Sequence, residues 1–94
     1  MMLEMRLTIH GRVQGVGYRY SILNHLEQNQ IMVRGYVKNK PNGTVEIVGQ
    51  GDVEALKDLR RFAVAGSSRS EVREIEETYL EIGEYTFDSF SIDY

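Results

Sequence analysis

Residues 33–49 read VRGYVKNKPNGTVEIVG, and this stretch decides the fold that the sequence predicts. Its two halves, Val33–Lys40 and Thr44–Gly49, are extended runs separated by Pro41-Asn42-Gly43. Proline, asparagine and glycine supply the backbone geometry of tight turns. The stretch therefore predicts an antiparallel hairpin near the middle of the chain.

A helix is predicted on each side of this hairpin. Over residues 18–28, apolar side chains recur at helical spacing with polar residues between them. These apolar residues are Ile22, Leu23 and Leu26. After the hairpin, Asp52 is a good N-cap and Gly66 suits a helix end, which predicts a second helix between them. Its apolar stripe consists of Ala55, Leu56, Leu59, Phe62 and Ala63.

Extended segments are predicted outside both helices. Met5–Ile9 alternates apolar and polar residues, and Val72–Leu80 does so in its first half. Phe87–Ile92 predicts a short last strand. This order of elements predicts a ferredoxin-like βαββαβ fold of the α+β class, an α/β sandwich with an antiparallel sheet and both helices on one face. At 94 residues, we expect one domain covering residues 1–94.

Composition excludes several classes of function. The chain has no cysteine, so it contains neither a disulfide nor a cysteine nucleophile. Its net charge is −3 and its basic residues are scattered, which argues against nucleic-acid binding. No segment approaches the run of about 18 apolar residues that a membrane helix needs, and none resembles a leader. We therefore expect a cytoplasmic protein without a membrane partner.

The polar residues show no pattern typical of a metal site. His10 and His25 are the only histidines, and neither belongs to a ligand motif. We expect no metal and no cofactor, with His10 on the solvent face of its strand and His25 on a helix surface. Ser67–Ser70 is expected to be a polar connector. The acidic residues near the chain end predict a solvated face; they are Glu71, Glu74, Glu76, Glu77, Glu81 and Glu84.

A glycine-rich loop precedes the first predicted helix. Residues 11–17 contain three glycines, and such a loop directs free backbone N–H groups toward an anion at the helix N-terminus. The loop lacks the Gly-Lys-Ser or Gly-Lys-Thr of a Walker A loop. It also fails to match a dinucleotide-binding motif, because that motif would need glycine in place of Tyr20. Arg19 opposes the helix dipole, so an anion is expected to compensate it. From pattern alone, Arg19 could equally face solvent or a carboxylate, and Asn39 could simply end a strand.

Two motifs resemble those of the acylphosphatase family. Residues 11–19, GRVQGVGYR, resemble its glycine-rich signature, and residues 35–39, GYVKN, followed by NGTVE at 42–46, resemble its second one. The resemblance extends over nearly the whole chain, which implies a single acylphosphatase-like domain. It implies that Arg19 and Asn39 are catalytic, with Asn39 orienting the attacking water. The implied phosphate-binding residues are Gln14, Gly15, Val16, Gly17, Tyr18 and Arg19.

This resemblance also predicts the chemistry and its partners. The substrate would be a small acyl phosphate, and inorganic phosphate would be both product and competitive inhibitor. The departing carboxylate has a pKa of about 4, so no general acid is needed. The segment between Arg19 and Gly35 is longer than is usual in the family, which predicts an irregular exit from the first helix.

Two rival functions use the same fold. An RNA-binding domain is suggested by Arg34-Gly35-Tyr36, but the residues that follow depart from the aromatic motif of that class. A non-catalytic acylphosphatase-like regulatory module is the second rival. Because both candidate catalytic residues are present, we expect a free enzyme, and we expect it to be a monomer.

Overall fold

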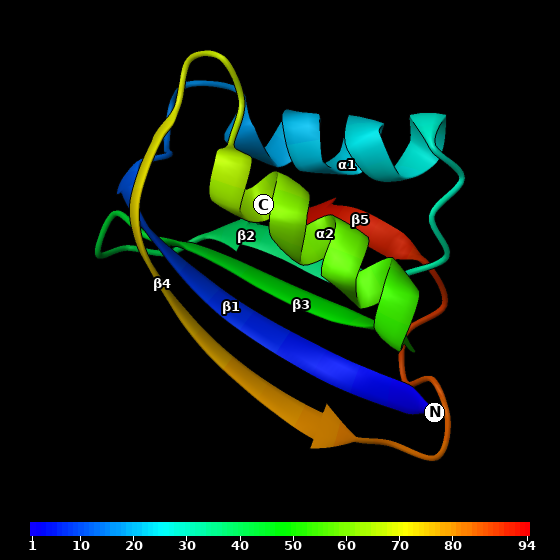
Figure 1. The fold of residues 1–94 in the computed structure, drawn as a ribbon. Helices are drawn as coiled ribbons and strands as arrows, with labels where there is room; N and C mark the ends of the chain where they lie inside the picture. The colour runs from blue at the N-terminus through cyan, green and yellow to red at the C-terminus, as the bar shows by residue number, and fades with distance from the viewer.

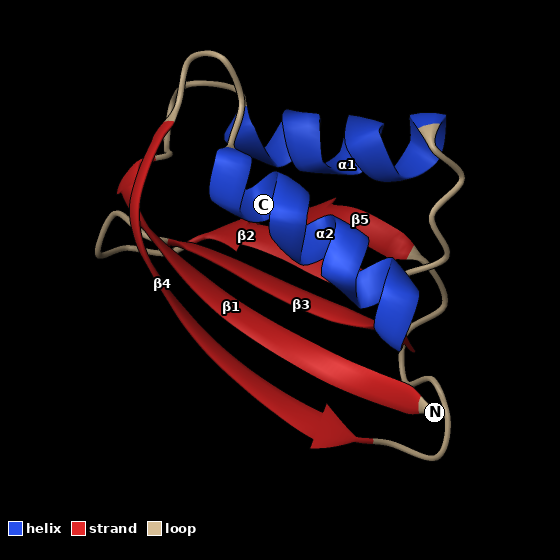
Figure 2. Ribbon diagram, in the orientation of Figure 1, coloured by secondary structure: helices blue, strands red, loops and turns tan.

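A five-stranded sheet carries both helices on one face in the computed structural model, which describes all 94 residues (Figure 1, Figure 2). The strand order is β4-β1-β3-β2-β5. The elements are β1 Met2–Arg12, α1 Tyr18–Gln28, β2 Arg34–Asn39, β3 Val45–Asp52, α2 Val53–Ala65, β4 Glu71–Glu81 and β5 Phe90–Asp93. The predicted ferredoxin-like α+β fold is confirmed.

The central hairpin forms as its sequence predicts. β2 and β3 pair antiparallel from Arg34 opposite Gln50 to Asn39 opposite Val45. In the turn, the Asn42 side-chain oxygen accepts hydrogen bonds from both the backbone N–H and the hydroxyl of Thr44. This side chain replaces backbone partners that the turn leaves unpaired. The hairpin thereby fixes the position of Asn39 at the end of β2.

Helix α2 begins and ends where local chemistry directs it, whereas α1 begins after Gly17 without a side-chain cap. The Asp52 carboxylate accepts a hydrogen bond from the N–H of Ala55 at 2.9 Å, and α2 ends at Gly66, whose φ is 73°. The core lies between the helices and the sheet. Its fully buried members include Met5, Leu7, Ile9, Ile22, Val37, Ile47 and Leu59. Neither helix has the length and apolar character needed to cross a membrane.

The exit from α1 was expected to be irregular, but it has the geometry of a standard helix C-cap. Gln30 adopts a left-handed conformation with φ 53°. Its N–H donates to the Glu27 carbonyl at 3.3 Å, and the N–H of Ile31 donates to the Leu26 carbonyl at 2.9 Å. These two bonds form a Schellman motif with glutamine at the position usually taken by glycine. The extra length between Arg19 and Gly35 leaves the start of β2 undisturbed, because β2 pairs with β3 without a break from Arg34 to Asn39.

The last strand corrects one feature of the predicted sheet. β5 pairs with β2 in parallel, from Gly35 beside Phe90 to Lys38 beside Asp93, so the sheet is mixed rather than wholly antiparallel. The direction follows from the preceding segment, residues 82–89, which returns across the sheet before β5 begins (Figure 1). Two 2.8 Å hydrogen bonds between Gln50 and Thr86 hold that segment on the sheet.

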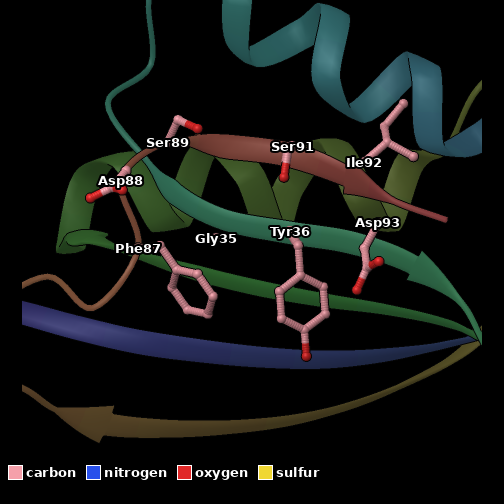
Figure 3. A pocket seen from close by; sticks show the side chains of 8 residues that line it. All are labelled: Gly35, Tyr36, Phe87, Asp88, Ser89, Ser91, Ile92 and Asp93. Carbon is pink, nitrogen blue, oxygen red and sulfur yellow. The ribbon is translucent and has the colours of Figure 1, made fainter.

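The sheet face opposite the helices carries a hollow of about 320 Å³. Figure 3 shows Tyr36 and Phe87 pointing into it, whereas Ile92 points toward α1. The Tyr36 ring meets Phe87 edge-on at 5.8 Å, and its hydroxyl donates to Glu46 at 2.8 Å. Tyr36 therefore belongs to the open face, away from the glycine-rich loop.

Candidate active site

The loop between β1 and α1 presents a row of free backbone donors. Gly15 and Gly17 have φ values of 73° and 77°, and each has open space around the position of a β-carbon. The glycines are thus required by backbone conformation rather than by crowding. Ser21 makes the first α1 hydrogen bond, to the Gly17 carbonyl. The N–H groups of residues 14–20 accordingly donate to no protein acceptor, and they remain available to a ligand at the helix N-terminus, where an anion is favoured.

Gln14 holds this loop against the central hairpin. Its side-chain NH₂ group donates to the carbonyl of Lys40 at 2.8 Å and to that of Thr44 at 2.9 Å. The side chain is therefore engaged in a structural clamp. Only the backbone of Gln14 remains available to the predicted phosphate site.

The side chains of Tyr18 and Val16 anchor the loop to the hydrophobic core. Tyr18 is 1% exposed, and its hydroxyl donates to the Ala63 carbonyl at 2.7 Å. Burial raises the pKa of Tyr18, so the phenol stays neutral. Val16 is also buried in the core. Both residues were predicted to bind phosphate, and their side-chain positions restrict any such contact to the backbone.

A single pocket of about 200 Å³ brings the two predicted catalytic residues together. It is lined by Val13, Gly15, Gly17, Tyr18, Arg19, Tyr20 and Asn39. Arg19 forms no ion pair with any carboxylate, which removes one of the alternatives left open by its sequence pattern. An unpaired guanidinium beside free N–H groups makes the pocket suited to a phosphoryl group.

Asn39 places an unsatisfied amide in the same pocket. Its side-chain oxygen is buried and has no hydrogen-bond partner in the protein. Buried polar atoms are nearly always paired, so an unpaired one indicates a site that is completed by a ligand or water. The strand-end position alone does not explain an oxygen in this state.

The other polar residues form surface contacts away from this pocket. His10 bonds Glu76 at 2.6 Å on the outer face of the sheet, as predicted. The prediction for His25 is wrong, because it stacks on Phe62 at 4.1 Å and bonds Asp58 at 2.6 Å between the two helices. Helical spacing alone could not reveal this contact, which depends on how α1 packs against α2. No three histidine, aspartate or glutamate side chains gather at one point.

Two tyrosines at the pocket were missed by sequence analysis. Tyr20 lines the pocket, and the ring of Tyr94 lies 5.2 Å from the Arg19 guanidinium. For Tyr20, its place directly after Arg19 at the start of a helix was an available signal. Tyr94 had none, because only the parallel pairing of β5 brings it to this end of the sheet.

Comparisons with known proteins identify the same family over nearly the whole chain. The family described as Acylphosphatase matches residues 5–92. An acylphosphatase of Petrotoga mobilis is 38% identical over 99% of this chain and 100% of its own. The crystal structure of Bacillus subtilis acylphosphatase is 37% identical, covers 98% of this chain and 99% of its own, and has a TM-score of 0.86. Full-length HypF, in its phosphate- and nucleotide-bound form, shares the fold at 24% identity and a TM-score of 0.81, over 12% of its chain.

Proposed function

Since this chain belongs to the acylphosphatase family and is a hydrolase of acyl phosphates, we propose that Arg19 and Asn39 are its catalytic residues. Arg19 and the N–H groups of residues 14–19 would bind the phosphoryl oxygens. Asn39 would hold the water that attacks phosphorus. The observation that carries the proposal is the shared pocket, in which an unpaired guanidinium and an unsatisfied amide lie together.

The reaction asks for little beyond positioning and charge stabilisation. Water attacks phosphorus in line with the bond to the acyl oxygen, and the carboxylate leaves from the opposite side. Because that carboxylate is a stable leaving group, no side chain needs to protonate it. The loop and Arg19 would stabilise the negative charge on the equatorial oxygens, while Asn39 supplies alignment.

Further properties follow from this arrangement. Because Arg19 and the backbone dipoles supply the positive charge, we propose that turnover needs no metal and no cofactor. Inorganic phosphate would compete with substrate, since the loop recognises the phosphoryl group and not the acyl part. We also propose that residues 1–94 act as one monomeric domain in the cytoplasm, which the acidic charge and the cysteine-free composition support.

The regulatory-module alternative is favoured by one observation. The fold of this chain recurs as 12% of the longer HypF chain. A module of that kind could bind phosphate without hydrolysing acyl phosphates. Catalysis by the isolated chain therefore discriminates between the two functions.

The experiment measures phosphate release from benzoyl phosphate by the purified chain, with and without EDTA. We expect hydrolysis above the spontaneous rate and no loss with the chelator. Arg19→Ala should weaken phosphate inhibition and turnover together, whereas Arg69→Ala, in the exposed α2–β4 connector, should change neither. Hydrolysis at the background rate would leave only the regulatory function, and unchanged phosphate inhibition in Arg19→Ala would remove Arg19 from the site.

A further inference from the structure

Two exposed tyrosines stand at the entrance to the catalytic pocket. Tyr20 and Tyr94 are 60% and 84% exposed, although Tyr20 lines the pocket and Tyr94 lies over Arg19. The hydroxyl interaction with Tyr20 raises the pKa of Tyr94, and the positive charge of Arg19 opposes this. The two hydroxyl groups therefore lie close to each other, and the Tyr94 ring lies 5.2 Å from the Arg19 guanidinium.

The sheet topology accounts for their meeting. β5 runs parallel to β2, with Asp93 beside Lys38, so the next residues along these strands are Tyr94 and Asn39. Side chains alternate along a strand, and Ile92 points toward α1 (Figure 3). Tyr94 consequently lies on the same side as Ile92, where the first turn of α1 carries Tyr20.

The geometry of the reaction leaves one region for the acyl group. The phosphoryl group occupies the loop, and the water held by Asn39 lies opposite the leaving carboxylate. Two other lining residues, Val13 and Tyr18, are buried at 1% exposure and close the pocket from within. Of the lining side chains, only that of Tyr20 is exposed and has no proposed role in binding phosphate or water. The acyl group of the bound substrate would therefore extend out of the pocket beside Tyr20.

We propose that Tyr20 and Tyr94 form an acyl-group subsite that selects aromatic acyl phosphates over small aliphatic ones. An aryl group can pack offset or edge-on against these rings, whereas an acetyl group is too small to cover them. The inference rests on the proposed binding of phosphate by Arg19 and the loop.

The test compares kcat/KM for benzoyl phosphate and acetyl phosphate. In Tyr20→Leu and Tyr94→Leu, the benzoyl-to-acetyl ratio should fall about 3- to 10-fold, as expected for one lost aromatic contact. The Tyr20→Phe and Tyr94→Phe variants keep the rings and should keep the ratio. Tyr79→Leu is the matched control, since Tyr79 is 48% exposed on β4 at the far edge of the sheet and should also keep the ratio.

The inhibition constant of phosphate in the same variants shows whether a substitution alters recognition of the acyl group or disturbs phosphate binding by Arg19. We expect the inhibition constant to stay near that of the wild type in Tyr20→Leu. An unchanged ratio in both leucine variants, or an equal fall for both substrates, would overturn the subsite. Failure of the proposed function looks different, because the wild-type chain would then hydrolyse neither substrate.

Discussion

At the scale of single residues, Arg19 and Asn39 each carry an unfavourable feature that a ligand would relieve. A cation in the first turn of a helix costs about 0.3–1 kcal/mol, and this first turn contains no acidic residue to offset it. The amide oxygen of Asn39 is buried without a partner. Residues that reduce stability in this way are retained where they serve binding or catalysis.

Asn39→Ala tests the role of the amide in positioning water. Its hydrogen bond matters in the transition state and little in the substrate complex, so kcat should fall about 10²- to 10³-fold at nearly constant KM. Steady-state kinetics with benzoyl phosphate measure both constants. Asn24→Ala, at an exposed position of α1, is the control. A wild-type kcat in the folded variant, verified by thermal melting, would exclude the role.

At the scale of elements, the site depends on a contact between a loop and a hairpin. Gln14 ties the loop to the carbonyl of Lys40, directly after Asn39 in the chain, and to that of Thr44 across the turn. The clamp thus joins the loop proposed to bind phosphate to the hairpin that carries Asn39, which we propose holds the water. The clamp adds to the pairing of β1 and β2 with β3, which also connects the two halves of the site.

Gln14→Ala should therefore impair both stability and binding. Loss of two part-buried hydrogen bonds should lower the free energy of unfolding by about 1–3 kcal/mol. Phosphate inhibition should weaken as well, because the loop is no longer held. Urea denaturation and inhibition kinetics measure the two effects, with the exposed Gln28→Ala as control. An unchanged inhibition constant would show that the loop keeps its shape unaided.

α2 and β4 are joined by an ion pair whose contribution depends on pH. Arg60 donates two hydrogen bonds to Glu77, at 2.9 and 2.7 Å. The Arg60 hydrogen bonds, followed by one from Tyr79, lower the pKa of Glu77 from 4.5 to about 2. A carboxylate with a lowered folded-state pKa stabilises the fold above pH 4.5, and this contribution is lost as the pH falls toward 2.

Glu77→Gln should accordingly be less stable than wild type at pH 7 and equally stable near pH 2. Because the pair is at the surface, the expected difference at pH 7 is only up to about 1 kcal/mol. Urea unfolding of both proteins across this range measures it. Glu84→Gln, at an exposed loop position, should match wild type throughout. A difference that persists at low pH would show that Glu77 acts by packing rather than by charge.

Local signals predicted elements better than they predicted contacts between elements. The bounds of α1 and the Asp52 cap of α2 agree with the sequence prediction, because helical spacing and capping are local. The parallel direction of β5 was not predicted, since it depends on how residues 82–89 cross the sheet. Tyr94 was missed for the same reason, and His25 because its partners lie on the other helix.

At the scale of the whole molecule, an acidic protein must bind an anionic substrate. The net charge is −3, so the overall field does not attract phosphate. The proposed site lies at one end of the sandwich, where the loop after β1 meets the start of α1 and the ends of β2 and β5 (Figure 1). Binding should therefore follow the local donors and not the global charge.

Inorganic phosphate should stabilise the folded chain in proportion to its binding. At a concentration about 100 times its Kd, a ligand specific for the native state adds about 2.7 kcal/mol, which for this size raises Tm by on the order of 10 °C. Thermal melting with phosphate measures the shift, and chloride at equal ionic strength is the control. Arg19→Ala should lose most of the shift and Asn39→Ala should retain it. Equal shifts with chloride would rule out a specific site.

The outer strand β4 has a consequence for how copies of the chain behave together. Its edge is unpaired over eleven residues, and it exposes Leu80 and Tyr79, features that invite another strand to add to the sheet. Glutamates recur along it, at positions 71, 74, 76, 77 and 81. Glu77 pairs with Arg60 and Glu71 with Arg73, but the strand keeps an excess of negative charge at neutral pH, which opposes the addition of a second β4. Acid removes this repulsion as the carboxylates become protonated, so acidification favours the growth of intermolecular sheets from this edge.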